Sequence, residues 1–283
     1  MPSDEPQLTD LMHLGREKVI GAWRVGDVII DPGPASCLPA QIAELERRPP
    51  RALLLTHIHL DHAGAAGSLA ARFEDLEVCV HERGAPHLAD PSRLLASAER
   101  LYGADMQRLW GEVLPVAPER IRALSGGESL PGGLRVAYTP GHASHHVAYL
   151  HEPSGFAFAG DVAGVRIAAG PTLAPTPPPD IDLAAWRESI DAISGWRPAA
   201  LAITHFGSYE DVESQLGRLR EYLDEIETDA ARLDEQAFAA AYRARLAAAA
   251  SDATAATYEQ AMPPGQSYAG LRRHLERARD AGS

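Results

Sequence analysis

The chain of 283 residues is 45% hydrophobic and 23% charged, a composition that fits a globular protein and excludes a wholly disordered one. Its 26 basic against 39 acidic residues give a formal net charge of −13, which argues against a surface that neutralises phosphates, so we expect no nucleic-acid partner. The sequence contains no apolar stretch of membrane-spanning length and begins without the apolar core of a signal peptide, so we expect a cytoplasmic protein with no membrane partner.

Short strands and helices alternate through the first part of the chain. A Gly-Asp turn and a β-branched run predict a strand over 25–31, and a wholly apolar run predicts a strand covered on both faces over 52–56. Between them, the apolar spacing over 38–48 predicts a helix. Further helices are expected over 63–73, 93–110 and 183–193, and further strands over 78–80, 134–138, 147–150, 156–159 and 199–204. Interleaving of this kind indicates an α/β protein.

Two segments depart from this alternation. Residues 170–180 include three consecutive prolines and cannot form regular structure, so we expect an ordered or gating loop there. From about Glu210 the strand pattern ends, and alanine-rich segments favour helices, with a break at the Pro-Pro-Gly run. These helices are expected over 216–226, 230–250 and 271–278. We therefore divide the chain into an α/β domain, 1–212, and an all-helical C-terminal region, 213–283.

The strongest chemical signal is a His-x-His-x-Asp-His motif at 57–62, directly after an expected strand. Imidazole nitrogen and carboxylate oxygen are ligands that suit zinc, manganese or iron. In an extended turn, His57 and His59 point the same way because side chains alternate every two residues. Asp61 and His62 then fall at the start of the next helix, where they can face a second metal.

Three further residues of ligand type lie just past short strands, where the sites of α/β proteins usually assemble. His142 ends a Thr-Pro-Gly-His turn, Asp161 follows the strand expected over 156–159, and His205 follows the strand expected over 199–204. The sequence therefore predicts that these three residues join the motif at 57–62 in one metal centre.

In this order and spacing, these motifs resemble the metallo-β-lactamase-fold hydrolases over about residues 10–210. The resemblance implies a four-layer αββα sandwich with a two-metal centre at one edge of the sheets, and a helical C-terminal extension that caps the active site. By position it assigns the first metal to His57, His59 and His142, the second metal to Asp61, His62 and His205, and a bridging role to Asp161. Two divalent ions are expected. Zn²⁺ is the preferred assignment, and Mn²⁺ and iron are the alternatives. Because all seven positions are present, the redox flavodiiron branch, which typically has glutamate at the second histidine, is disfavoured.

The chemistry implied is hydrolysis of an acyl bond, a thioester or a lactone, in a small-molecule substrate by a hydroxide that bridges the two metals. Asp61 is the expected catalytic residue, because its carboxylate can orient the hydroxide and relay a proton to the leaving group. The alternatives are a phosphodiesterase with the same two metals, β-lactam hydrolysis as a side activity, and a non-catalytic binding protein. Glyoxalase II-type thioester hydrolases share the size and the helical end, but residues 162–166 do not resemble that group. Quorum-quenching lactonases commonly carry tyrosine where this chain has Gly164.

Several neighbouring residues have open or minor expected roles. His146 either supports a metal ligand or binds metal itself, whereas His145 is expected to be an exposed or loop residue. Tyr209 is expected to pack, and Arg166 either meets a substrate carboxylate or forms a surface salt bridge. No catalytic role is expected for the histidines without partners at ligand spacing, which are His13, His81, His87, His151 and His274. The physiological substrate, the metal and the oligomeric state stay open.

Overall fold

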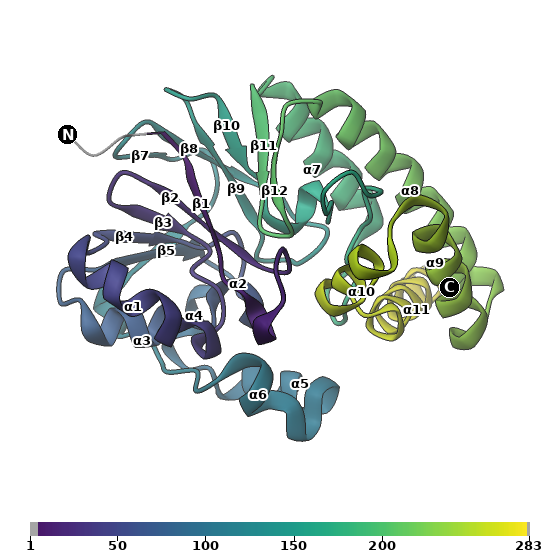
Figure 1. Ribbon diagram of the computed structural model, residues 1–283, viewed down its shortest axis with the longest axis horizontal. Coiled ribbons are helices and arrows are strands. Elements are labelled where there is room, and N and C mark those ends of the chain that lie inside the picture. Colours follow the sequence, from purple (N-terminus) through teal and green to yellow (C-terminus); the bar gives the residue numbers. More distant parts are fainter. Residues whose placement is uncertain (1–4, 282–283) are drawn as a thin grey trace.

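Two six-stranded sheets pack face to face, and helices cover the outer face of each sheet (Figure 1). The computed structural model of the protein describes residues 5–281. The expected four-layer αββα sandwich is therefore confirmed, and so are the helices that follow it at the C-terminal end. Within the described range, no helix has the length and apolarity that a membrane span requires.

The first sheet has the order β1-β2-β3-β4-β5-β6 and is mixed, since β3 to β6 pair in parallel while β1 to β3 pair antiparallel. Its strands are β1 (Gln7–Asp10), β2 (Gly21–Val25), β3 (Val28–Ile30), β4 (Ala52–Leu54), β5 (Glu77–His81) and β6 (Ile121–Leu124). The helices between them are α1 (Leu38–Arg47), α2 (Leu60–Ala63), α3 (Ala66–Arg72), α4 (Ala85–Ala89), α5 (Ser92–Tyr102) and α6 (Met106–Trp110). Short 3-10 turns are η1 (His13–Gly15), η2 (Ala35–Cys37), η3 (Gly103–Asp105) and η4 (Pro118–Arg120).

The second sheet has the order β12-β11-β10-β9-β8-β7 and is antiparallel except for the β10–β11 pair. Its strands are β7 (Ser129–Leu130), β8 (Leu134–Tyr138), β9 (Val147–His151), β10 (Phe156–Phe158), β11 (Ala200–Ile203) and β12 (Gly207–Tyr209). The turn η5 (Gly160–Ala163) and the helix α7 (Leu183–Gly195) connect β10 to β11. The strands expected over 147–150 and 156–159 are therefore confirmed and pair as the antiparallel hairpin β9–β10, and the proline-rich stretch 170–180 forms no helix or extended strand.

The period of two in strand β4 distributes its side chains between two cores. Leu53 packs with Val78 and Leu69 in the layer between the first sheet and its helices. Leu54 points the opposite way and packs with Tyr149 and other residues between the two sheets. A wholly apolar strand follows directly from this arrangement, because both of its faces are buried.

The C-terminal end forms four helices, α8 (Val212–Arg232), α9 (Glu235–Ala249), α10 (Asp252–Ala261) and α11 (Pro264–Ala281). The buried positions Leu216, Leu219, Leu223 and Ile226 of α8 recur at spacings of three and four residues, which places them on one face of the helix. This face shares one apolar core with Trp186 of α7 and with strand β11. Because that core is continuous, the boundary at 212/213 stays a prediction.

The sequence missed β1, most of β2, β6, β7 and β12, and the helices α4 and α10. Strands β1, β6, β7 and β12 are only two to four residues long, and β1 and β12 contain no buried residue, so each pattern is too short to predict a strand. The expected helix over 93–110 is also divided, because Gly103 adopts a positive φ of 50° at the end of α5. In Figure 1, α5 and α6 extend from the main body at the lower edge of the view.

Candidate metal centre

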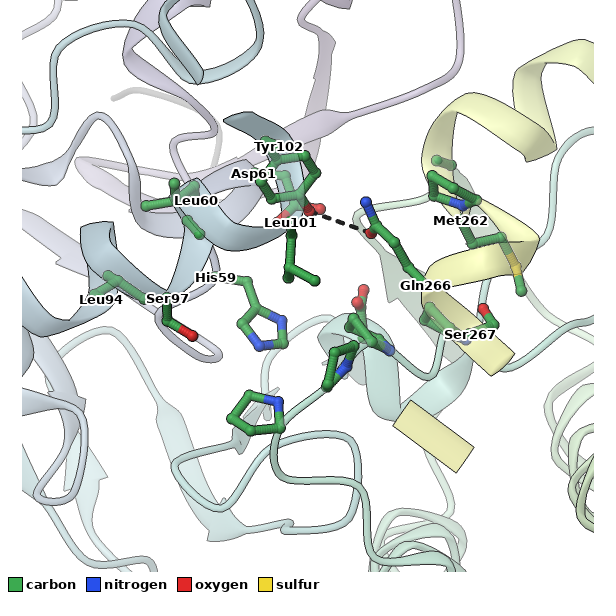
Figure 2. Close-up of a pocket in the computed structure, with 18 residues that line it drawn as sticks. His59, Leu60, Asp61, Leu94, Ser97, Leu101, Tyr102, Met262, Gln266 and Ser267 are labelled. Carbon is green, nitrogen blue, oxygen red and sulfur yellow. Dashed lines mark hydrogen bonds between the residues drawn. The ribbon is translucent and has the colours of Figure 1, made fainter. Parts of the chain in front are cut away.

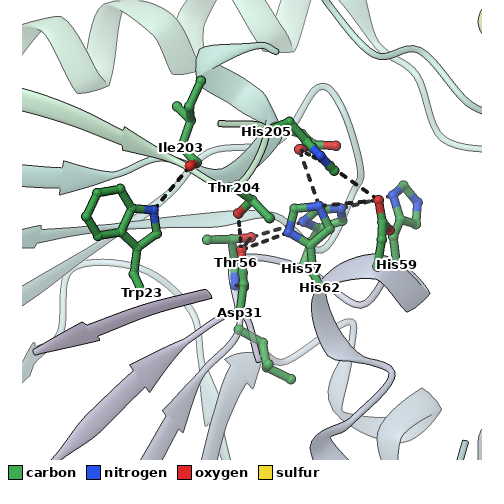
Figure 3. Close-up of polar contacts among 12 residues, drawn as sticks. Trp23, Asp31, Thr56, His57, His59, His62, Ile203, Thr204 and His205 are labelled. Carbon is green, nitrogen blue, oxygen red and sulfur yellow. Dashed lines mark hydrogen bonds and ion pairs between the residues drawn. The ribbon is translucent and has the colours of Figure 1, made fainter. Parts of the chain in front are cut away.

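The structure brings all seven predicted ligands together at one edge of the two sheets. His57 follows β4, His142 follows β8, and His205 directly follows β11. His59, Asp61 and His62 lie at the start of α2, as expected. Asp161 lies in the turn η5 after β10. Strands of both sheets therefore end at this cluster, part of which is drawn in Figure 3.

Three imidazoles form the first half of the cluster. The Nδ1 atom of His59 lies 3.0 Å from Nε2 of His57 and 2.9 Å from Nε2 of His142. The Nδ1 atom of His142 lies 2.8 Å from the carbonyl oxygen of Pro175, which can only accept, so Nδ1 donates and Nε2 presents a lone pair. Burial lowers the pKa of His142, lowers that of His59 to about 4, and lowers that of His57 well below its ordinary value. Neutral rings with converging lone pairs are the donor set that a cation requires.

The second half combines imidazoles with a carboxylate. The Oδ2 atom of Asp61 lies 3.3 Å from Nε2 of His205 and 3.8 Å from Nε2 of His62. Burial by itself lowers the pKa of His62, but the carboxylates of Asp161 and Asp61 outweigh it and raise that pKa well above its ordinary value. The same balance raises the pKa of His205. In this half, the structure stabilises positive charge.

Asp161 lies between the two halves and faces both. Its Oδ2 atom lies 3.3 Å from Nε2 of His142, and its Oδ1 atom lies 3.3 Å from Nε2 of His62 and 3.6 Å from Nε2 of His205. Burial alone raises the pKa of Asp161, but the facing histidines hold it well below its ordinary value. The side chain is only 5% exposed. One carboxylate oxygen for each half is the arrangement that the bridging role implies.

The cluster fits two metal ions on its own chemistry. The buried Nε2 atom of His62 and the buried Oδ1 atom of Asp161 have no hydrogen-bond partner. Buried polar atoms without partners are costly, and a cation satisfies both at once. The donor atoms of three groups lie within 4.8 Å of one another: His57 with His59 and His142, His57 with His62 and Asp161, and Asp61 with His62 and His205. Imidazole and carboxylate suit zinc, manganese or iron, so the donor set does not name the metal.

Sequence reasoning missed Asp31, which supports the second half. Its Oδ2 atom lies 2.8 Å from Nδ1 of His62 and accepts hydrogen bonds from the hydroxyls of Thr56, at 2.7 Å, and Thr204, at 3.0 Å (Figure 3). Such a carboxylate fixes the histidine ring so that Nε2 faces the metal side. The available signal was an acidic residue immediately after the buried strand β3.

The two other histidines of the turn after β8 pack on His57. His146 stacks against it at a centroid distance of 5.1 Å, and its Nδ1 atom bonds the hydroxyl of Thr139 at 2.9 Å. His145 lies in the expected loop, but it is half-buried and also stacks on His57, at 6.2 Å. Both rings therefore support a predicted ligand by packing.

Arg166 and Tyr209 contact each other. The Arg166 guanidinium lies 4.1 Å from the centre of the Tyr209 ring and donates to Asp211 at 2.6 Å. The Tyr209 hydroxyl donates to the backbone carbonyl of Arg166 at 2.6 Å. Of the two roles left open for Arg166, the structure shows the salt bridge, and it shows Tyr209 packing as expected.

Two adjoining cavities open onto the cluster. The smaller, of about 90 Å³, reaches His59 and Asp161, and the larger, of about 270 Å³, reaches His205. Figure 2 shows the smaller cavity between α5, the start of α2 and the C-terminal helices. His13, for which sequence analysis expected no role, lines the larger one. Helices α5 and α6 and the C-terminal helices α10 and α11, which lie outside the sheets, therefore form much of the cleft wall.

The profile of the Metallo-beta-lactamase superfamily matches residues 26–205, which is well over half of the chain and includes every predicted ligand. The chain belongs to the metallo-β-lactamase superfamily. The metallo-beta-lactamase fold-containing protein ST1585 of Sulfurisphaera tokodaii is 30% identical over 162 residues, which cover 55% of this chain and 60% of that relative. A hydroxyacylglutathione hydrolase of Xanthomonas campestris pv. campestris is 30% identical over 158 residues, which cover 55% of this chain and 48% of the relative.

Solved structures of this superfamily share the fold. The crystal structure of the archaeal protein ST1585 from Sulfolobus tokodaii has a TM-score of 0.65 at 24% identity, and the match covers 83% of this chain and 89% of that one. TTHA1623, in a di-iron-bound form, has a TM-score of 0.52 at 26% identity, over 70% of this chain and 91% of that one. The sequence alignments to the two relatives described first, the ST1585 protein and the hydroxyacylglutathione hydrolase, span only about half to three-fifths of the length of those relatives.

Proposed function

We propose that this chain is a dinuclear metal-dependent hydrolase that cleaves an acyl bond, a thioester or a lactone, in a small-molecule substrate. The observation that carries the proposal is Asp161, whose two carboxylate oxygens face two separate groups of buried ligand atoms. Relatives named hydroxyacylglutathione hydrolase, at 30% identity, support the acyl class. A similar structure described as di-iron-bound supports two metals, and we propose Zn²⁺ first, with Mn²⁺ or iron as alternatives.

His57, His59 and His142 would hold one ion, Asp61, His62 and His205 the other, and Asp161 both. When bound, a pair of divalent cations supplies Lewis-acid polarisation of an acyl carbonyl and lowers the pKa of water. The protein's own part is to hold these donors rigidly in place and to keep the rings of His57, His59 and His142 neutral. The backbone carbonyls of Pro175 and Val19 hold His142 and His205, and Asp31 holds His62.

Asp61 is placed to move the proton of the reaction. Its side chain is 20% exposed, against 5% for Asp161, and it lines both cavities. The facing imidazoles of His62 and His205 hold the pKa of Asp61 below its ordinary value against the opposing effect of burial, so the group is ionised, which is the form that a proton acceptor requires. In thioester hydrolysis the water oxygen bonds the acyl carbon and the carbon–sulfur bond breaks. Asp61 takes a proton from the attacking water and gives it to the leaving sulfur, which yields a carboxylic acid and a thiol.

The test is acid release, followed with a pH indicator, from a thioester, a lactone and a β-lactam by the metal-reconstituted protein. We expect the thioester or the lactone to be cleaved fastest, with two metal ions bound per chain. A marked preference for the β-lactam would contradict the proposal. If the protein binds two metals but releases acid from none of the three substrates, the result would also contradict the proposal and would favour the phosphodiesterase alternative. A chain that binds no metal after native purification would favour a binding protein.

The proposed partner is a small molecule, with no nucleic acid or membrane. The formal net charge of −13 supports this part of the proposal. A cytoplasmic location stays an expectation, which fractionation of cells that express the chain would test.

A further inference from the structure

The two cavities meet at one contact between distant parts of the chain. The hydroxyl of Tyr102, at the end of α5, donates a hydrogen bond of 3.3 Å to Oε1 of Gln266 in α11 (Figure 2). Tyr102, Gln266 and Asp61 line both cavities, so this contact and the Asp61 carboxylate lie where the cavities join. A ligand that reaches the cluster therefore has two directions in which to extend, one on each side.

The smaller cavity has apolar walls. It is lined by Leu94, Ser97, Pro177 and Met262 beside the ligands His59 and Asp161. Its volume of about 90 Å³ is one third of the 270 Å³ of the larger cavity, so we assign the shorter arm of a substrate to it.

The larger cavity, of about 270 Å³, is wider and more polar. It is lined by His13, Asp105, Trp110 and Gln260 beside the ligand His205. His13 stacks on Trp110 at a centroid distance of 5.6 Å, which forms an aromatic wall. Burial lowers the pKa of His13, so its imidazole is neutral at pH 7.

Neither cavity offers a site for a negative charge away from the metal ligands. Within residues 5–281, no lysine or arginine lines either cavity. Arg16 and Arg108 contact residues of the larger wall, but both are engaged, Arg16 with Gln260 at 2.8 Å and Arg108 with Asp105 at 3.0 Å. Asp105 itself would repel an anion. A carboxylate on either arm of a substrate would therefore lose its hydration without gaining a cationic partner.

We propose that the substrate is uncharged on both sides of the bond that is cleaved, with a short acyl arm in the smaller cavity and the leaving-group arm in the larger one. The proposal rests on the acyl-hydrolase function above. The assignment of the arms follows from Asp61, which lines both cavities but whose Oδ2 atom lies 3.3 Å from Nε2 of His205, a residue that lines only the larger of the two. A proton passed from Asp61 to the leaving atom requires that atom on this side.

The test uses thioesters that differ only by a carboxylate and its uncharged amide. For the leaving-group arm, the pair is butanoyl-N-acetylcysteine and butanoyl-N-acetylcysteinamide. For the acyl arm, succinyl and succinamoyl thioesters of N-acetylcysteinamide are compared. We expect kcat/KM of the metal-loaded protein to favour the amide by at least about tenfold in both pairs. Equal or faster cleavage of the carboxylate in either pair overturns the inference.

A charge variant tests the assignment of the arms. Asp105→Asn removes the acidic group of the larger cavity and frees Arg108. It should reduce the discrimination against the leaving-group carboxylate by about two- to fivefold and leave the acyl-arm ratio unchanged. The matched control is Glu188→Gln, an equal change of charge at an exposed position of α7 that lines neither cavity. A change confined to the acyl-arm ratio overturns the assignment.

A binding measurement separates this inference from the proposed function. The S-butyl thioethers of N-acetylcysteine and its amide cannot be hydrolysed, so calorimetry with the metal-loaded protein reports binding alone. If no thioester is cleaved but the amide binds at least about tenfold more tightly, the hydrolase proposal fails and the inferred preference for an uncharged ligand stands. If thioesters are cleaved but the carboxylate binds equally well, the inference fails and the hydrolase stands. If neither thioether binds at millimolar concentration, the inference is overturned.

Discussion

The histidines in the two halves of the metal centre all lie in the interior of the protein, yet their pKa values shift in opposite directions. His57, His59 and His142 face mainly one another, so burial decides and lowers the pKa of each ring. His62 and His205 are equally buried, but the carboxylates of Asp61 and Asp161 reverse the effect. Because burial lowers the pKa of every one of these rings, the comparison teaches that neighbouring carboxylates decide which histidines in this site depart from that direction.

The halves also differ in what lies behind them. His142 is held by the backbone carbonyl of Pro175, whereas His62 is held by the carboxylate of Asp31. A carbonyl orients the ring, and a carboxylate also raises the basicity of the ligand. His62 therefore depends on a side chain that substitution can remove, whereas the backbone carbonyl that holds His142 is present whatever residue stands at position 175. The following predictions use this difference, from the largest expected effect to the smallest.

Asp161→Asn should damage both halves at once. The amide keeps the shape of the side chain but removes the negative charge that faces His142, His62 and His205. We expect activity to fall by more than about 100-fold, beyond the range typical of residues behind the ligands, with fewer than two metals per chain by elemental analysis. The control is Asp191→Asn, an exposed acid that pairs with Arg220 and should behave as wild type. Full metal content with near-normal activity would show that Asp161 does not bridge.

Asp61→Asn should separate catalysis from metal binding. The first half contains no atom of Asp61, so we expect it to keep its metal, while turnover falls by about 100-fold or more because the proton acceptor is lost. Steady-state kinetics and metal content of the same preparation measure both. Unchanged turnover would refute the role of Asp61 in proton transfer.

Asp31→Asn should weaken one half only. Metal affinity of the second half is expected to fall by about 10- to 100-fold, because His62 loses its carboxylate partner. The first half should change less, because Asp31 reaches His57 only through the hydroxyl of Thr56. Stepwise zinc titration by calorimetry resolves the two events. Thr204→Val removes one hydrogen bond to Asp31 and keeps the carboxylate, so its effect should be smaller. Equal weakening of both binding steps would contradict the division into halves.

Proton release on metal binding should differ between the halves. In the metal-free folded chain, the pKa values of His62 and His205 lie above the ordinary 6.5, so these rings hold protons that a cation must displace. Their contribution to the stability of the metal-free fold is fully present below pH 6.5 and is lost as the pH rises through the folded pKa. The first-half rings are already neutral at pH 7. Indicator measurements during zinc titration at pH 7 should therefore show more proton release in the second half; equal release in both steps would contradict this.

Much of the site could be predicted from the sequence, because metal binding depends on the types of the ligand residues and on their positions after strands. The motif at 57–62 and the later residues His142, Asp161 and His205 all lie where the sequence placed them. Their role as metal ligands stays a prediction that the metal analyses above will test. Strands such as β4 could also be predicted from the sequence, because a strand that is buried on both faces requires a continuous apolar run.

The tertiary structure alone decided the partners of these residues. Asp31 reaches Thr204 across 173 positions of the chain, and Tyr102 reaches Gln266 across 164. An aspartate after a strand or a glutamine in a helix has the same sequence pattern whether it faces solvent or a metal ligand. Sequence therefore determined the donor set and the alternation of strands and helices, which follow from local chemistry and periodicity, while the layers of the sandwich were implied by the resemblance to a family. The cleft walls and the charge of each histidine were decided by packing, because both depend on which distant side chains the fold brings within a few ångströms.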